Sequence, residues 1–180
     1  MRMGPLLGVL AALAGPAHAE EMQAVDRFLD FVTNGCVQAI ATGTSASGFA
    51  QRAGTKPAPH ELAASLLGKD TGAVFVRDDP RYPIALTERV NGPCSVHARF
   101  PTADLDGPVA AIHDFIAGPG SRFYEARVFE EAAGTSWVTH RVYVGRRGQK
   151  ALTLLFSTHP KAGSLDQVAV TVAADDTAPR

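Results

Sequence analysis

The stretch PIALTERVNGPCSVHARF, residues 83–100, is the part of the chain that decides the fold. From Cys94 onward every second residue is apolar, which is the period of a strand with one buried face and one face in water. The run before it alternates in the same way, with Glu88 as the exception on its apolar side. An Asn-Gly-Pro turn signal separates the two runs, so the stretch predicts a β-hairpin.

Two loop lengths are compatible with this turn. A two-residue loop, Asn91-Gly92, places the apolar sets of the two strands on opposite faces of the hairpin. A three-residue loop that also includes Pro93 pairs Val90 with Cys94 and puts both sets on one face. We favour the longer loop, because a shift of one residue exposes a whole apolar set to water. Cys94 is then expected to point into the core.

The N-terminus has the pattern of a secretory signal peptide. Arg2 supplies a positive charge, Leu6–Ala14 is a short apolar run, and Ala17-His18-Ala19 has the A-x-A form of a cleavage site. The apolar run is about half of the roughly 20 residues that a membrane-spanning helix needs. We expect a signal peptide at 1–19 and a single domain at 20–180, located in the periplasm or secreted, with no transmembrane segment after cleavage. The alternative is an amphipathic or buried N-terminal helix.

The chain contains two cysteines, Cys36 and Cys94. In an exported protein an even pair is most simply a disulfide. A metal pair or a redox pair is the alternative, although neither cysteine has a second one nearby and no C-x-x-C motif is present. Residues 20–42 carry an apolar stripe at helical spacing that includes Cys36. The sequence therefore predicts that this helix packs on the hairpin and is bonded to it.

The remaining elements complete an α+β pattern. Further helices are expected at 60–67 and 105–116, and further strands at 72–77, 122–130, 137–144, 152–156 and 168–172. Tight turns join the later strands, so they predict an antiparallel meander. The order predicts a two-layer domain, with an antiparallel sheet of about six or seven strands, helices on one face and the other face at least partly open. Pairing Val144 with Leu152 directs the valines of 137–144 into the core.

The open face of this sheet carries the residues that we predict as a binding surface: Arg99, Arg127, Trp137, Arg141 and Tyr143. Guanidinium groups bind carboxylates and stack on aromatic rings, so an envelope protein or an anionic glycan is the expected partner. The alternative is an ordinary solvated sheet face with cross-strand Arg–Glu pairs. The exposed aromatic residues favour a partner.

The evidence for catalysis in the sequence is weak. His140, between two valines, is either a tuned acid or base or a core histidine with one hydrogen bond. No histidine pair has the spacing of metal ligands, and no G-x-S-x-G elbow, phosphate loop or dinucleotide fingerprint is present, so no metal or cofactor is expected. The net charge of −1 argues against nucleic acid as the main partner. Gly145–Lys150 is a basic hairpin tip, which suits either an acidic partner or lipid headgroups, or simply keeps the protein soluble.

Three stretches carry a resemblance: FVTNGC at Phe31–Cys36, GAVFV at Gly72–Val76 and GPCSVHA at Gly92–Ala98. Together they are similar to a group of small exported proteobacterial proteins of unassigned activity. The similarity covers about half of the mature chain. Its motifs are two cysteines and a strand pattern, so it implies a compartment and a fold and carries no catalytic residue over.

Two functions are therefore considered. The first is a non-enzymatic binding module or cell-envelope accessory module that uses the open sheet face. The second is a small envelope hydrolase that uses a histidine and a carboxylate near that face. A deep cleft with converging polar groups favours the enzyme, and a shallow aromatic and basic surface favours the binding module.

Overall fold

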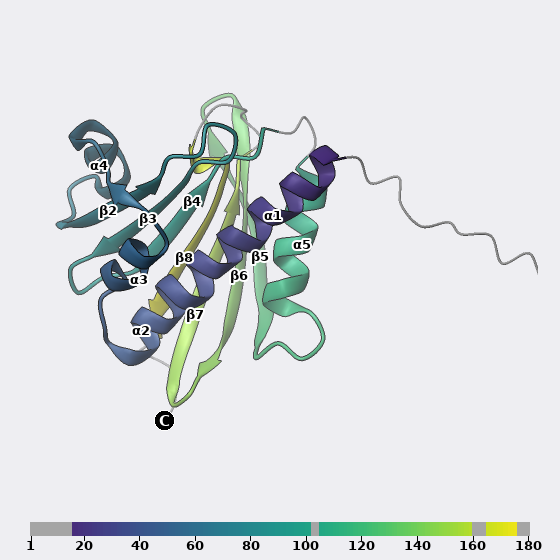
Figure 1. Ribbon diagram of the computed structural model, residues 1–180. Coiled ribbons are helices and arrows are strands. Elements are labelled where there is room, and N and C mark those ends of the chain that lie inside the picture. The colour runs from purple at the N-terminus through teal and green to yellow at the C-terminus, as the bar shows by residue number, and fades with distance from the viewer. Residues whose placement is uncertain (1–15, 102–104, 160–164, 176–180) are drawn as a thin grey trace, which may run out of the picture.

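The computed structural model describes residues 16–101, 105–159 and 165–175. Within these residues the chain forms an eight-stranded antiparallel sheet with helices packed on it (Figure 1). The predicted α+β class is confirmed, with more strands than expected. Most of the predicted signal peptide lies outside the described residues, and 16–19 belong to the first helix. None of the described helices combines the length and the apolar character needed to cross a membrane.

The strand order is β1-β2-β3-β4-β8-β7-β6-β5. The last strands of the two halves, β4 and β8, thus meet in the middle of the sheet, and each half extends outward from them. The order of elements along the chain is α1 (Pro16–Asp30), the π-helix η1 (Phe31–Val37), α2 (Gln38–Thr42), α3 (Ser47–Arg52), β1 (Lys56–Pro57), α4 (His60–Leu67), β2 (Gly72–Arg77), β3 (Ile84–Arg89), β4 (Cys94–Ala98), α5 (Asp106–Ala117), β5 (Phe123–Ala133), β6 (Ser136–Arg147), β7 (Lys150–Thr158), the 3-10 helix η2 (Leu165–Gln167) and β8 (Val168–Ala174).

The β3–β4 hairpin has the predicted buried face and a loop that lies one position earlier. Glu88 pairs with Cys94, and the Arg89 N–H donates to the Pro93 carbonyl at 3.4 Å. The loop is therefore residues 90–92, and its central asparagine has a φ of 55°, which asparagine tolerates. The pairing differs from the prediction by two residues, so the apolar residues of both strands still share one face.

The predicted first helix is continuous from α1 to α2 and contains the π-helical turn η1. A Cβ at Gly35 of this turn would lie 2.9 Å from the Leu86 side chain and 3.2 Å from Phe49. The wide turn and the missing side chain let the helix approach the sheet closely. The next residue, Cys36, forms the predicted disulfide with Cys94, and their Cα atoms lie 5.2 Å apart.

The main core lies between the sheet and the helices α1 and α5, which contact each other (Figure 1). The helices contribute large apolar side chains such as Phe28 and Ile112. Alternate residues of three strands complete the core, as the sequence predicts: Cys94, Val96 and Ala98 of β4, Leu152, Leu154 and Phe156 of β7, and Val168, Val170 and Val172 of β8.

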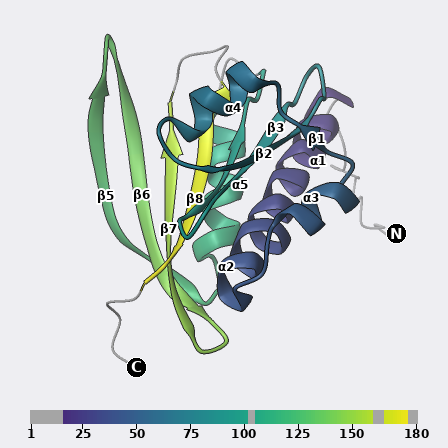
Figure 2. The same ribbon diagram turned by 90° about the vertical axis from the view of Figure 1, so that its left-hand side faces the viewer.

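The helix α4 lies on the other face of the sheet. In Figure 2, α4 stands over β2 and β3, where Leu66 packs with Val74 and Ala85 in a second, smaller apolar cluster. The prediction that the helices lie on one face is therefore wrong for α4. The reason is that β2 is apolar on both faces: Phe75 packs toward the main core, and Val76 packs toward α4.

The register of β6 differs from the prediction by one residue. Gly145, rather than Val144, pairs with Leu152 of β7. A slip of one residue exchanges the two faces of a strand. Tyr143 is therefore fully buried on the face that α1 and α5 cover, and Val142 lies on the opposite face. The predictions that the valines of β6 face the core and that Tyr143 faces water are wrong.

A hydrogen bond explains how β6 can bury its tyrosine. Tyr143 Oη lies 2.7 Å from Nδ1 of His113 in α5, so the one polar atom of the phenol is satisfied. Its aromatic ring also offers more apolar area to the core than a valine side chain does. Burial, together with the nearby carboxylate of Glu125, raises the pKa of Tyr143 to about 12.

Candidate functional site

The five predicted binding residues do not form one surface. Arg127 lies on the sheet face opposite α1 and α5, which we call the open face, and its guanidinium carbon is 4.9 Å from the centre of the Phe129 ring. Arg141 lies on the helix-covered face instead, where it donates to Glu125 at 2.9 Å. Tyr143 is buried on that same face.

The other two predicted residues lie further away. Trp137 is 60% exposed near the β5–β6 turn, and the alternation of the strand puts it on the same face as Arg141. Arg99 follows β4 and donates to the Pro80 carbonyl at 3.5 Å. Of the predicted set, Arg127 is thus the residue that contributes to the exposed surface of β5–β8 on the open face.

A transverse row of side chains crosses the open face. Paired neighbours on β4, β8, β7, β6 and β5 form this histidine row: His97, Ala169, Ser157, His140 and Phe129. Directly paired residues of an antiparallel sheet point to the same face. The row therefore places two histidines, a serine hydroxyl and an aromatic ring on one face of the sheet.

His140 makes three side-chain contacts in and beside this row. Its Nδ1 lies 2.8 Å from Ser157 Oγ, and its Nε2 lies 3.6 Å from Glu131 Oε2. Its ring stacks on Phe129 with 4.8 Å between the ring centres. The imidazole is 13% exposed and the Glu131 side chain 72% exposed, so the ring is held in place and the acid stands in solvent.

A second serine–histidine pair lies close to the β5–β6 turn. Ser136 Oγ is 2.8 Å from Nε2 of His159 and donates to the Ala133 carbonyl at 3.1 Å. Sequence reasoning missed both pairs. The signal that finds the first pair is the register of β6 against β7, because only the observed pairing places Ser157 opposite His140.

Apolar side chains lie beside the histidine row on the open face. Val142 pairs with Leu155 of β7 and with Arg127 of β5, and Val144 pairs with Tyr124. We call Tyr124, Val142, Val144 and Leu155 the apolar patch. Tyr124 is 65% exposed, and the other three are partly exposed. Among the described helices, α4 packs on the open face over β2 and β3 (Figure 2), and Leu165 of the 3-10 helix η2 packs against the same apolar cluster.

The order Ser157–His140–Glu131 has the residue types of a nucleophilic triad. Its setting does not match one in two respects. Ser157 lies inside β7, between β6 and β8, where backbone N–H groups are used in the ladder and cannot stabilise an oxyanion. The 3.6 Å between His140 and Glu131 is also longer than a hydrogen bond.

A cleft of about 850 Å³ lies away from the histidine row, between the β3–β4 loop, α2 and the start of β7. Its charged groups are already used by the fold. Glu88 accepts hydrogen bonds from Ser45 Oγ at 2.8 Å and from the Ala46 N–H at 2.9 Å. Lys150 donates to the Ile40 carbonyl at 3.1 Å. These contacts explain why a glutamate sits on the apolar side of β3, and they give the cleft a structural role.

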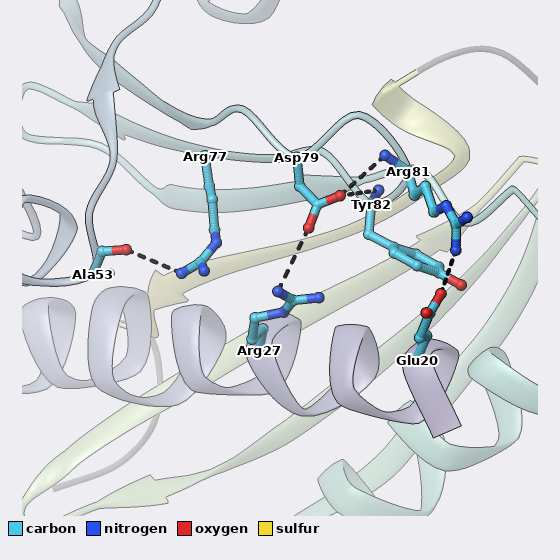
Figure 3. A network of polar contacts seen from close by, with 7 residues as sticks. All are labelled: Glu20, Arg27, Ala53, Arg77, Asp79, Arg81 and Tyr82. Carbon is cyan, nitrogen blue, oxygen red and sulfur yellow. Dashed lines mark hydrogen bonds and ion pairs between the residues drawn. The ribbon is translucent and has the colours of Figure 1, made fainter. Parts of the chain in front are cut away.

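A polar network ties the β2–β3 loop to α1 (Figure 3). Asp79 accepts from the backbone N–H groups of Arg81 and Tyr82 at 3.0 Å, and it lies 3.5 Å from Arg27. Arg81 in turn pairs with Glu20. Burial alone raises the pKa of Asp79, but the two backbone hydrogen bonds and the nearby arginine charges outweigh it and lower the pKa. The network holds the loop on the helix.

The described residues contain no group of three or more histidine, cysteine, aspartate or glutamate side chains arranged to hold a metal ion. Comparison of the chain with known protein families, with curated proteins and with solved structures finds no match. The class of protein is therefore given by the structure itself, as an antiparallel α+β protein with a Cys36–Cys94 disulfide.

Proposed function

We propose that this protein is a non-enzymatic binding module of the cell envelope, and that it binds an envelope protein through the histidine row and the apolar patch. The observation that carries this proposal is the exposure of the apolar patch. In the N-terminal half, α4 covers the corresponding sheet face and buries its apolar side chains. The C-terminal half presents similar side chains to solvent, and exposed patches of this kind mark interaction sites.

The composition of the surface favours a protein over the anionic glycan that the sequence also allows. Apolar and aromatic groups lie at its centre, hydroxyl and imidazole groups lie beside them, and Arg127 and Glu131 stand at the rim, as in protein interfaces. The Phe129 ring is in contact with both His140 and Arg127, so this ring does not offer a sugar the free aromatic face that stacking needs. Export is supported by the signal-peptide pattern and by the disulfide, which persists in oxidising compartments.

The proposal is tested by site-specific photo-crosslinking in intact cells. A photoreactive residue at Val142 probes the apolar patch, and one at Val128 is the matched control, because Val128 is 45% exposed on the opposite face of the same hairpin. We expect a discrete crosslinked envelope protein from position 142 and not from position 128. Equal products from both positions, or none from position 142, would contradict the proposal.

A charge at the centre of the patch gives the second arm of this test. Leu155→Glu places a carboxylate on the open face, so it is expected to abolish the crosslink from position 142 with little change in the free energy of unfolding. Retention of the crosslink at normal intensity would show that the patch is not the contact surface.

The second candidate function is the small hydrolase, and the hydrogen bond between Ser157 and His140 is the observation that favours it. The measurement is hydrolysis of a p-nitrophenyl ester by the purified protein and by Ser157→Ala. Because the backbone N–H groups around Ser157 are used in the sheet ladder and cannot stabilise an oxyanion, we expect the same rate from both proteins. A rate that falls by about a hundredfold in Ser157→Ala would favour the enzyme over the binding module.

A further inference from the structure

A small pocket opens where the C-terminal ends of η1 and α5 meet the β6–β7 turn. Its volume is about 250 Å³. Figure 1 shows the α5–β5 connection and the β6–β7 turn at the same end of the sheet. The lining is apolar in its interior, with Val32, Val37 and Leu154, and Phe115 also lines it and is 52% exposed.

Three arginines also line the pocket: Arg122 comes from the α5–β5 turn, and Arg146 and Arg147 come from the end of β6. Arg146 donates to the Gln149 carbonyl at 2.9 Å, which fixes its guanidinium group. Within the part of the chain that the structure describes, no hydrogen bond or ion pair is formed by the side chains of Arg122 and Arg147. The pocket thus combines an apolar interior with positive charge that the described residues do not neutralise.

The α5–β5 turn is built to hold Arg122 in place. Ser121 Oγ donates to the Ile116 carbonyl at the end of α5, and it accepts from the Phe123 N–H at 3.1 Å. On the neighbouring strand, a Cβ at Gly145 would lie 2.3 Å from the Arg122 carbonyl oxygen. The turn therefore lies against β6 in a way that glycine alone permits.

From this geometry we infer a ligand site for a small apolar carboxylate, such as a medium-chain fatty acid, with its chain against the apolar lining and its carboxylate on Arg122 and Arg147. Arg122 and Arg147 are exposed, so both are accessible to a carboxylate, and guanidinium groups bind carboxylates with two parallel hydrogen bonds. The volume is just below the roughly 300 Å³ at which pockets for drug-sized ligands begin, so a single short chain fits and a two-chain lipid does not. This site is separate from the open face and does not depend on the proposed function.

The probe is octanoate, with 1-octanol as the neutral control of the same chain length, and the measurement is the titration of backbone amide shifts by NMR. We expect octanoate to shift the amides of Thr33 and Ser121 and to bind about tenfold more tightly than octanol. Binding is expected to weaken as salt is added, because the rim arginines are in contact with solvent. Equal binding of the two compounds, or shifts confined to other regions, would overturn the assignment.

Two variants test whether octanoate binds in the pocket or is attracted by positive charge elsewhere on the surface. Arg122→Ala/Arg147→Ala is expected to weaken octanoate binding about tenfold and to leave octanol binding unchanged. Lys69→Ala is the matched control, since it removes an exposed positive charge at the end of α4, and it should bind octanoate normally. Unchanged octanoate binding by the double variant would overturn the site.

A third arm distinguishes a free amphiphile from a membrane surface. Vesicles of phosphatidylglycerol and phosphatidylcholine are mixed with the protein and sedimented, and the bound fraction is measured with and without octanoate. We expect the protein to stay in solution. Sedimentation with the vesicles, lost in Arg122→Ala/Arg147→Ala and combined with no octanoate binding, would replace the pocket ligand by lipid headgroups and so overturn the inference.

Discussion

The two halves of the molecule share a topology and differ in what covers them. In the N-terminal half, β2 and β3 lie between α4 on one face and the main core on the other, and a disulfide bonds β4 to the helix layer. In the C-terminal half, α5 packs on one face of the hairpin strands, and the apolar patch on the other face is left to solvent. The difference indicates that the N-terminal half is built for stability and that the C-terminal half has exposed surface available for binding.

The two edge strands of the sheet also differ: the N-terminal edge offers little backbone for pairing, and the C-terminal edge is long. The N-terminal edge is β1, a pair of residues that includes Pro57, which cannot donate a ladder hydrogen bond. The C-terminal edge is β5, an 11-residue strand that is mostly exposed. Long edge strands invite pairing with other chains unless charges and bulges interrupt them, and β5 has both, with a bulge between Glu125 and Arg127. The C-terminal half is therefore guarded against edge pairing while its open face stays accessible.

The disulfide gives the largest expected effect. Cys36→Ala/Cys94→Ala removes a bond that spans 58 residues of sequence, and the loss in the free energy of unfolding is expected to be about 4 kcal/mol. Urea unfolding of the oxidised protein and of the variant, followed by circular dichroism, measures it. A loss below about 1 kcal/mol would mean that the N-terminal half does not depend on its covalent link.

Gly145→Ala tests the register that exposes the apolar patch. The new Cβ would lie 2.3 Å from the Arg122 carbonyl oxygen and 2.5 Å from the Phe123 ring. We expect the free energy of unfolding to fall by about 3 kcal/mol. The matched control is Gly107→Ala in α5, where the nearest atom is 3.8 Å from the added Cβ and helix propensity improves. Equal stability of the two variants in thermal unfolding would argue against the observed β5–β6 packing.

A pair of leucines compares the covered face with the exposed one. Leu66 of α4 is buried, so Leu66→Ala is expected to lower the free energy of unfolding by about 2 kcal/mol. Leu155 is only partly buried on the open face, and Leu155→Ala is expected to cost less than about 1 kcal/mol. Equal costs by urea unfolding would indicate that Leu155 is covered in solution, for example by a second copy of the chain, which analytical ultracentrifugation would detect.

Acid sensitivity is expected to begin in the N-terminal half. The folded state lowers the pKa of Asp79, so the stabilisation by its carboxylate is present above the pKa of an unfolded aspartate and is lost as the pH falls through the lower folded value. Asp79→Asn should therefore cost about 1 kcal/mol at pH 7 and lose that difference at acid pH. Stability of both proteins is measured from pH 7 down to about pH 3. A constant difference across this range would show that the charge of Asp79 is not the cause.

Much of the N-terminal half could be predicted because two periodicities agree there. The alternation of β3 and β4 places Cys94 inside, the helical stripe places Cys36 inside, and both interpretations remain valid when the loop moves by one position. The placement of α4 could not be predicted in the same way, because β2 has apolar residues on both faces and does not indicate which helix covers which face.

The C-terminal half misled the sequence analysis because both sides of β6 carry apolar side chains. The valines suggest that their own face of β6 is buried. The buried face is instead the opposite one, which carries Tyr143 and Gly145. The alternation of apolar residues alone does not decide between the two faces. The bulge in β5 adds a second reversal, so that Glu125 and Arg127 lie on opposite faces although their spacing predicts the same one. The pair Ser157 and His140 depends on the register of β6 against β7, and this explains why the candidate site was missed.

The position of β8 has a consequence for how the protein is made. This last strand pairs with β4 on one side and with β7 on the other, so it alone joins the two halves within the sheet. Both cysteines precede it by many residues, so their bond can close before β8 pairs with β4. Until β8 pairs with it, β4 is an unpaired edge strand of the N-terminal half. A chain that stops before residue 168 therefore leaves two unjoined sheets rather than a smaller version of one.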